Sequence, residues 1–362
     1  SVVDMPLRKA VTMIRGQKGT TAYLYVVPAD ADIDSKPIEI GIVRDTVQLD
    51  DRKAKITYYT TPDDTAEDGG DAAAPRKVGV IRLPAFYTDF DKKKKKVYNS
   101  ATIDIKRLLG EAKQENVDGM ILDFRRNKGG SMDEAITLAG LFVDAGPMVL
   151  QRSASRRVKN RNDTDPACHW DGPLLIMVNH YSASSTEIFA AAIQDYKRGV
   201  IMGDWKTHGK GTLQTLNSLQ RFLRHKEPFR ERRGGTLRLT TGKFYRVNGG
   251  STQRRGVTPD IVFPSFNDHK KIGDTHLQFG MEWDTIDQAQ YDIRIDVTPH
   301  IPLLREQSQA RVTIKPSYDD FVADVAKAAE RAKRKSVPLQ IDQRRAFRQG
   351  SRDWSKRVGK YA

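Results

Sequence analysis

The stretch that decides the fold is Leu174–Tyr196, LLIMVNHYSASSTEIFAAAIQDY. Its first five residues form an unbroken apolar run, as in a buried strand, and Glu187–Tyr196 repeats apolar side chains at helical spacing. A buried strand that turns sharply into a helix is typical of an α/β fold, and it is also the geometry that presents a nucleophile. Four hydroxyl side chains are concentrated at this turn: Ser182, Ser184, Ser185 and Thr186.

The same turn has a purely structural interpretation. Ser184 and Glu187 have the spacing of a capping box, in which the serine hydroxyl and the glutamate carboxylate accept hydrogen bonds from backbone N–H groups at the start of a helix. A catalytic serine also needs a base. None of the seven histidines stands in a recognisable sequence relation to a carboxylate, so the residues alone leave both interpretations open.

Lys210 is the other candidate for the base. It lies between Gly209 and Gly211, which remove side-chain bulk on both sides and allow a close approach. The alternative is an exposed lysine in a hairpin turn. To be neutral near pH 7 its pKa must fall by about three units from about 10.4, which costs about 4 kcal/mol and requires burial.

The pattern of elements along the chain predicts an α/β core with mainly parallel strands. We expect a flexible loop at residues 63–76, which are acidic and aperiodic, and a polar, mainly helical region beyond Pro264. The expected strands are 22–27, 38–43, 53–60, 78–83, 119–124, 174–178 and 200–202, and the expected helices are 6–15, 100–115, 133–142, 187–196 and 318–333.

Composition bounds the class of protein. The net charge of +15 is compatible with nucleic-acid binding, but the run at 92–96 has no interleaved aromatic residues, so a solvated basic face is the better interpretation. Cys168 is the single cysteine, which excludes an intrachain disulfide and a cysteine-rich zinc site. No apolar run is long enough for a membrane helix. Because the chain begins with Ser1, we expect a processed chain or a fragment whose export signal has been removed.

Four motifs, in the right order, resemble those of the carboxyl-terminal processing (tail-specific) serine proteases of the periplasmic Prc type. The resemblance extends from about residue 2 to at least residue 265. The motifs are GMILDFRRNKGG (119–130), YSASSTEIFAAAIQDYKR (181–198), GKGTLQ (209–214) and KFYRVNGGSTQRRGVTPDI (243–261).

The resemblance implies a crotonase/ClpP-like fold and peptide-bond hydrolysis through an acyl-enzyme, with no metal and no cofactor. Ser184 matches the nucleophile, Lys210 the general base, and Gln214 the group that orients the lysine amine. Asp195 matches an acidic position with a supporting role, and Ser182 is expected to be structural. Backbone N–H groups of three residues are candidates for the oxyanion hole: Gly129, Gly130 and Ser185.

The resemblance also implies a division of the chain. Residues 1–46 match the second half of a PDZ-like domain, 47–265 the Ser-Lys protease core, and 266–362 form a basic, mainly helical region. The expected substrates are proteins or peptides with exposed, unstructured, apolar C-terminal ends, with an adaptor protein as a further partner and no specific nucleic acid. The expected location is the periplasm.

Three departures from the family pattern keep other functions open. Lys128 stands where the family has a glycine, Ser185 and Thr186 replace a small Ala-Ser pair, and the loop 204–208 is one residue longer. The Lys128 substitution and the altered turn motivate the alternative of a catalytically impaired, protease-like binding scaffold. A less favoured alternative is binding of an anionic surface or nucleic acid through the basic face, which a steep salt dependence would reveal.

Overall fold

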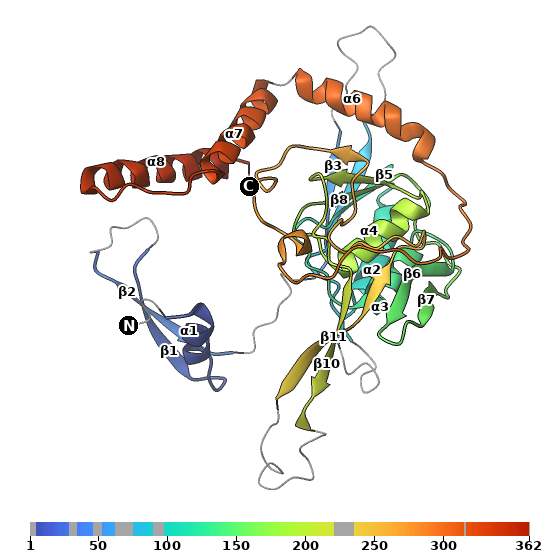
Figure 1. Cartoon of the computed structure of the whole chain (residues 1–362), viewed down its shortest axis with the longest axis horizontal. Coiled ribbons are helices and arrows are strands. Elements are labelled where there is room, and N and C mark those ends of the chain that lie inside the picture. Colours follow the sequence, from blue (N-terminus) through green and yellow to red (C-terminus); the bar gives the residue numbers. More distant parts are fainter. Residues whose placement is uncertain are drawn as a thin grey trace. The chain divides into compact units, whose positions relative to one another are not determined.

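The computed structural model describes residues 5–28, 35–45, 53–61, 75–89, 98–220, 235–314 and 316–361. The chain divides into two compact units, Ser1–Asp51 and Arg52–Ala362 (Figure 1). In the first unit, helix α1 (Leu7–Ile14) accompanies the antiparallel strands β1 (Thr21–Val26) and β2 (Ile38–Val43). The three elements predicted for this part of the sequence are confirmed.

The second unit contains a six-stranded sheet in the order β12-β9-β8-β5-β4-β3. All neighbouring strands run parallel except β3 and β4, which are antiparallel. The predicted mixed α/β fold is therefore confirmed. The strands are β3 (Lys55–Thr60), β4 (Lys77–Arg82), β5 (Gly119–Asp123), β8 (Leu174–Val178), β9 (Val200–Gly203) and β12 (Ile261–Val262).

A second, antiparallel sheet was not predicted. Its order is β10-β11-β6-β7, so β10 lies at one edge, and β10 and β11 form the long hairpin seen in Figure 1. The sequence VKNRND of β7 has one apolar residue, which explains why periodicity gave no strand signal there. The strands are β6 (Gly146–Ser153), β7 (Val158–Asp163), β10 (Thr212–Ser218) and β11 (Thr236–Tyr245).

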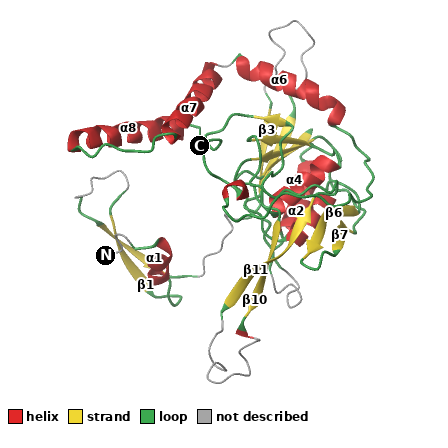
Figure 2. Ribbon diagram, viewed as in Figure 1, coloured by secondary structure: helices red, strands yellow, loops and turns green. Residues whose placement is uncertain are grey.

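Helices pack beside these strands (Figure 2). Helix α4 (Ser185–Asp195) contacts both β9 of the first sheet and β6 of the second, and most of its residues are buried. Phe189 on α4 packs against Phe86, Phe124 and Phe142. The start of α4 is therefore fixed by the core. Helices α2 (Ala101–Gln114) and α3 (Met132–Gly140) confirm two further predictions.

The region after β12 begins with a stretch that has little regular structure and continues with three helices. These are α6 (Ile301–Thr313), α7 (Pro316–Ala332) and α8 (Ile341–Gly359). Phe321 of α7 stacks with Phe266 and Tyr361, and the buried Asp324 pairs with Arg357 of α8. Among the described helices, none is both long and apolar enough to cross a membrane. Residues 63–74 of the predicted loop and the basic run 92–96 lie outside the described residues.

Candidate active site

Ser184 occupies a strained turn between β8 and α4. It is the N-cap of α4, and its backbone angles are φ 60° and ψ −116°. Such angles are rare for a residue other than glycine and cost about 1–3 kcal/mol, so they persist only where the surroundings enforce them. This is the geometry of a nucleophile elbow, in which a serine is presented above the end of a buried strand.

Three neighbouring hydroxyls hold this turn in place. Ser182 is fully buried and donates to the carbonyl of Phe124 (2.9 Å), as expected for a structural serine. Ser185 Oγ donates to the carbonyl of Gly130 (3.0 Å), and Thr186 Oγ1 donates to that of Asn127 (2.9 Å). Ser185 and Thr186 therefore fix the turn at Ser184 to the loop 127–130, and Ser182 fixes it to the end of β5.

The loop 127–130 passes so close to Ser184 that only glycine fits. A Cβ on Gly129 (φ 92°) would lie 2.7 Å from the carbonyl oxygen of Ala183 and 2.9 Å from Ser184 Cβ. The Gly129 N–H donates to Asn127 Oδ1 (2.9 Å), so it is already used. Within the described part of the chain, no acceptor is recorded for the N–H groups of Gly130 and Ser185.

Lys210 lies in a second loop whose glycines also allow close packing. A Cβ on Gly209 would lie 2.8 Å from the backbone of Arg254, and a Cβ on Gly211 would lie 2.6 Å from Gln253 N. The Lys210 ammonium donates to Gln214 Oε1 at 3.4 Å. Gln214 can reach it because the register of β10 shifts between Leu213 and Gln214, which bends the strand.

The pKa of Lys210 is lowered from its usual value of 10.5. Burial is the main cause and Arg238 adds to it, while Asp274 and Glu187 act in the opposite direction. A lowered pKa is what a lysine base requires. Among the hydrogen bonds recorded for the described residues, none joins Ser184 Oγ directly to Lys210 Nζ.

The buried carboxylate of Glu187 joins the serine turn to the lysine loop. One oxygen accepts the N–H of Ser184 (2.8 Å) and that of Lys210 (3.0 Å). The other accepts the hydroxyl of Thr207 and the N–H of Gly209, both at 2.6 Å. Burial raises the pKa of Glu187 to about 7, although all four hydrogen bonds oppose this. The sequence indicated only a capping role, because nothing in the motif shows partners more than twenty residues away.

Asp195 lies at the other end of α4 and does not contact Ser184. It accepts hydrogen bonds from Arg246 (2.5 Å) and Asn248 (2.8 Å), just beyond the end of β11. Burial raises its pKa, and Arg246 and Asn248 oppose that shift. Because β11 pairs with β10, which follows Lys210 directly, Asp195 is positioned to anchor the sheet that carries the lysine loop.

Replacing Asp195 with alanine is expected to lower the free energy of unfolding by about 2–4 kcal/mol, because it leaves the largely buried Arg246 without its partner. Denaturant titration measures this change. Glu111→Ala is the matched control: it removes an exposed i,i+4 partner of Arg107 and is expected to cost at most about 0.5 kcal/mol. Equal effects of the two substitutions would contradict the anchoring role.

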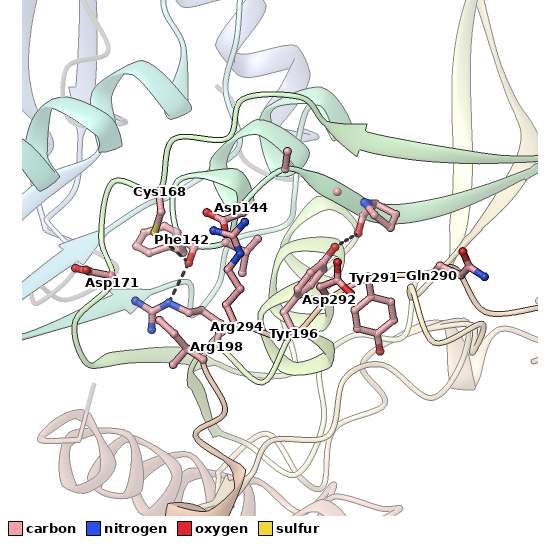
Figure 3. Close-up of a pocket in the computed structure, with 15 residues that line it drawn as sticks. Phe142, Asp144, Cys168, Asp171, Tyr196, Arg198, Gln290, Tyr291, Asp292 and Arg294 are labelled. Carbon is pink, nitrogen blue, oxygen red and sulfur yellow. Dashed lines mark hydrogen bonds and ion pairs between the residues drawn. The ribbon is translucent and has the colours of Figure 1, made fainter.

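A separate cavity of about 390 Å³ lies at the C-terminal end of α4 (Figure 3). Tyr196, Arg198 and Cys168 line it, whereas Ser184 and Lys210 do not. The Arg198 guanidinium donates to the carbonyls of Phe142, Trp170 and Gly172, so it holds the wall together. The cavity is therefore distinct from the site built around Ser184.

The strained serine beneath a glycine loop, on a mixed α/β fold, defines a protein of the serine-hydrolase class. Comparison with known proteins makes this more specific: the chain belongs to peptidase family S41, whose sequence model matches residues 77–263. A second model, the C-terminal domain of tail specific protease (DUF3340), matches residues 267–357.

Two curated relatives agree with the family assignment. A tail-specific protease of Haemophilus influenzae is 35% identical over 351 residues, which cover 95% of this chain and 46% of the relative. A carboxy-terminal-processing protease of Bartonella bacilliformis is 31% identical, with 71% of this chain and 50% of the relative covered. The photosystem II D1 C-terminal processing protease has a TM-score of 0.46 at 24% identity, covering 72% of this chain and 59% of that one. The chain thus spans about half the length of the curated relatives it matches.

Proposed function

We propose that this chain is the catalytic part of a serine endopeptidase of the C-terminal processing type. Ser184 is the nucleophile, Lys210 the general base, and Gln214 the residue that orients the lysine amine. The observation that carries the proposal is the Glu187 carboxylate, which accepts the backbone N–H of both Ser184 and Lys210. One buried group thereby fixes the relative position of the two residues that a Ser-Lys site needs.

In the acylation step, neutral Lys210 takes the hydroxyl proton of Ser184 while Oγ bonds to the carbonyl carbon of the scissile peptide. The lysine then gives this proton to the nitrogen of the leaving amine as the C–N bond breaks. The product is an ester on Ser184. A water molecule attacks the ester, Lys210 again takes and returns a proton, and the acid product leaves with Ser184 restored.

The developing oxyanion is stabilised by backbone N–H groups at the start of α4 and in the glycine loop. Gly130 and Ser185 fit this role, since neither N–H is committed to a recorded acceptor, whereas that of Gly129 donates to Asn127. Each such donor stabilises the transition state by about 3–4 kcal/mol. Lys128, which stands where the family has a glycine, is exposed.

The substrates proposed are proteins with unstructured, apolar C-terminal ends, as the names of the tail-specific relatives suggest. An extended chain can add to a sheet through its exposed edge, and the edge strand β10 begins directly after the lysine loop. We assign residues 1–46 to part of a PDZ-like domain, 47–265 to a crotonase/ClpP-like protease core and 266–362 to a helical C-terminal region. A periplasmic location and an adaptor partner complete the proposal.

The pH dependence of the rate is expected to follow the lysine. Because burial lowers the pKa of Lys210 from 10.5, kcat/KM is expected to rise with pH and to reach its plateau below pH 10.5. In the folded state the lysine loses its proton before it does in the unfolded chain, so this group also makes stability rise with pH between the two pKa values. A pH–rate profile on a fluorogenic peptide measures this rise of kcat/KM with pH. A midpoint of the rise at or above pH 10.5 would contradict a buried lysine base.

The function is tested by incubating the purified chain with an unfolded protein that has an apolar C-terminal tail and identifying products by mass spectrometry. The proposal expects peptide fragments that accumulate with time, and no fragments with the Ser184→Ala variant. The same protein with a charged tail, matched in length, tests the substrate class. If neither protein is cleaved by the folded chain, the proposed activity is wrong.

A further inference from the structure

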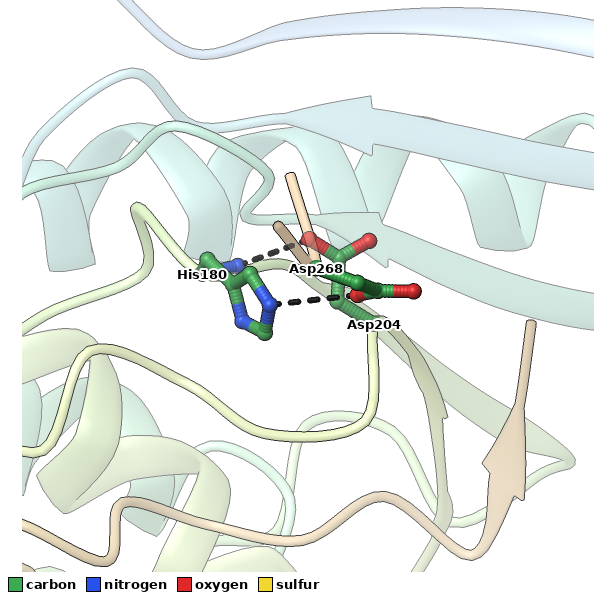
Figure 4. Close-up of side chains that lie close together, drawn as sticks. All are labelled: His180, Asp204 and Asp268. Atoms are coloured by element: carbon green, nitrogen blue, oxygen red, sulfur yellow. Dashed lines mark hydrogen bonds and ion pairs between the residues drawn. The ribbon is translucent and has the colours of Figure 1, made fainter. Parts of the chain in front are cut away.

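His180 occupies a buried position at the end of β8, four residues before Ser184. It is 4% exposed. Its Nδ1 lies 2.8 Å from the carbonyl oxygen of Lys206, and its Nε2 lies 3.2 Å from Asp268 Oδ1. Its backbone N–H donates to Asp204 Oδ2 at 3.0 Å. Figure 4 shows the three side chains grouped together.

These contacts determine where the imidazole carries its protons. A carbonyl oxygen can only accept, so Nδ1 must be the donor to Lys206. In a neutral ring Nε2 would then direct its lone pair at the Asp268 carboxylate, which is repulsive. The contact becomes favourable when Nε2 is also protonated beside an ionised Asp268, so the geometry favours an imidazolium.

The surrounding charges agree with this assignment. Burial alone lowers the pKa of His180, but the hydrogen bonds to Asp268 and Lys206 and the charge of Asp204 reverse the shift, and the pKa ends above its usual value. The ammonium of Lys206 is directed elsewhere, to the Arg254 carbonyl and the Thr275 hydroxyl. The ring of Trp205 also packs against the imidazole of His180, in an edge-to-face arrangement.

His180 and its polar partners belong to three parts of the chain: the serine turn, the lysine loop with Asp204 and Lys206, and the C-terminal segment with Asp268. His180 precedes Ser184 by four residues, and Lys206 precedes Lys210 by four. Asp268 lies in the segment matched by the C-terminal domain model. A second residue of that segment, Thr275, accepts from the Lys206 ammonium at 2.6 Å, so the segment contacts both the serine turn and the lysine loop.

We propose that His180 and Asp268 form a charged latch through which the C-terminal segment holds the serine turn and the lysine loop in register. His180 is then a positioning residue, and the C-terminal region is a working part of the active site. This inference rests on the function proposed above. The inference adds to that function a dependence of catalysis on a segment outside the protease core.

Asp268→Asn tests the latch, because the amide keeps the shape of the side chain and removes its charge. We expect kcat to fall about 10-fold, with KM changed less than about 2-fold, because the site is misaligned and the substrate surface is intact. Asp296→Asn is the matched control. It removes a 2.8 Å ion pair between the C-terminal region and Lys197, away from both loops, and is expected to leave kcat unchanged. An unchanged kcat for Asp268→Asn, or equal losses in the two variants, would overturn the latch.

The charge state of His180 is measured independently of activity by ¹⁵N NMR of the histidine-labelled chain, with the His180 signals assigned from a His180→Gln variant. We expect both ring nitrogens to be protonated at pH 6.5, and the midpoint of titration to fall in Asp268→Asn. Because the raised pKa belongs to the folded state, the latch stabilises the fold fully below about pH 6.5 and is lost as pH rises through the higher value.

The NMR measurement, together with a metal analysis, distinguishes the charged latch from a bound metal ion and from a neutral imidazole. His180, Asp204 and Asp268 have ligand atoms within 4.8 Å of one another, a spacing that a metal ion also fits. A stoichiometric metal in the purified protein, or a neutral ring with an unprotonated Nε2 at pH 6.5, would overturn the imidazolium. If the chain cleaves no substrate but His180 titrates as expected and responds to Asp268→Asn, the proposed function fails while the charged contact stands.

Discussion

Replacing Ser184 with alanine is expected to reduce kcat/KM by at least about 10⁴-fold, because no ester can form without the hydroxyl. The substitution removes one oxygen from a half-buried side chain, so the fold is expected to persist. Lys210→Ala is expected to cost nearly as much, and the double variant no more than either single one, since nucleophile and base act as a unit. Initial rates on a fluorogenic peptide measure all three.

Two substitutions serve as controls for this series. Ser155→Ala changes an exposed serine in the turn between β6 and β7, and Lys113→Ala changes an exposed lysine on α2. Both are expected to retain the full rate. Losses that add in the double variant would mean that Ser184 and Lys210 act independently, and full activity without Ser184 would show that another site or a contaminant cleaves the peptide.

Replacing Glu187 with glutamine is expected to reduce kcat by about 10²-fold or more and to lower the free energy of unfolding by about 2–4 kcal/mol. The Glu187 carboxylate accepts hydrogen bonds from four donors. Three of them are backbone N–H groups, which can donate but not accept. The amide of glutamine places an NH₂ group where an acceptor is needed. One of the two loops must then move, and the serine and lysine lose their register.

Glu134→Gln separates positioning from stability. Glu134 is also buried, also at the third position of a helix, and accepts hydrogen bonds from Ser100 and Thr102, but it contacts neither Ser184 nor Lys210. We expect this variant to lose stability and to keep kcat in the folded fraction. If both glutamine variants keep kcat, Glu187 is only a helix cap.

The pH dependence of stability gives a second test of Glu187. Its pKa is raised to about 7 in the folded state, against 4.5 for a free carboxyl group. Between these values the folded chain holds a proton that the unfolded chain has lost, so the contribution of this group makes the free energy of unfolding fall as pH rises from about 4.5 to about 7. Glu187→Gln is expected to remove that slope in denaturant titrations at several pH values.

The elements around the candidate site that could be predicted are those whose burial is visible in the sequence. The apolar run of β8 and the alanine-rich helix α4 are enclosed by the core, so their hydrophobic pattern was sufficient. The second sheet was missed because β7 and β10 are largely polar and exposed on both faces. Their pairing depends on backbone hydrogen bonds, which leave no periodicity in the sequence.

The candidate site also has a part that could be predicted from the sequence and a part that could not. Ser184, Lys210 and Gln214 lie in short motifs. The structure places Ser184 at the start of α4, Lys210 in the loop before β10, and Gln214 on β10. The connection between those loops could not be read from the sequence, because Glu187 meets residues 207–210 and His180 meets Asp268, across separations that no motif spans. Asp195 shows an intermediate case: the resemblance implied a supporting role, but only the structure identifies Arg246 as its partner.

The central claim is that Ser184 is the nucleophile of a peptidase. It is tested most directly by acid quenching during turnover of an activated peptide ester, followed by intact-mass and fragment analysis. The account predicts a mass increase equal to the acyl group, located on Ser184 and absent from the Lys210→Ala variant. An acyl group on another residue, or turnover with no covalent adduct under any quench time, would contradict it.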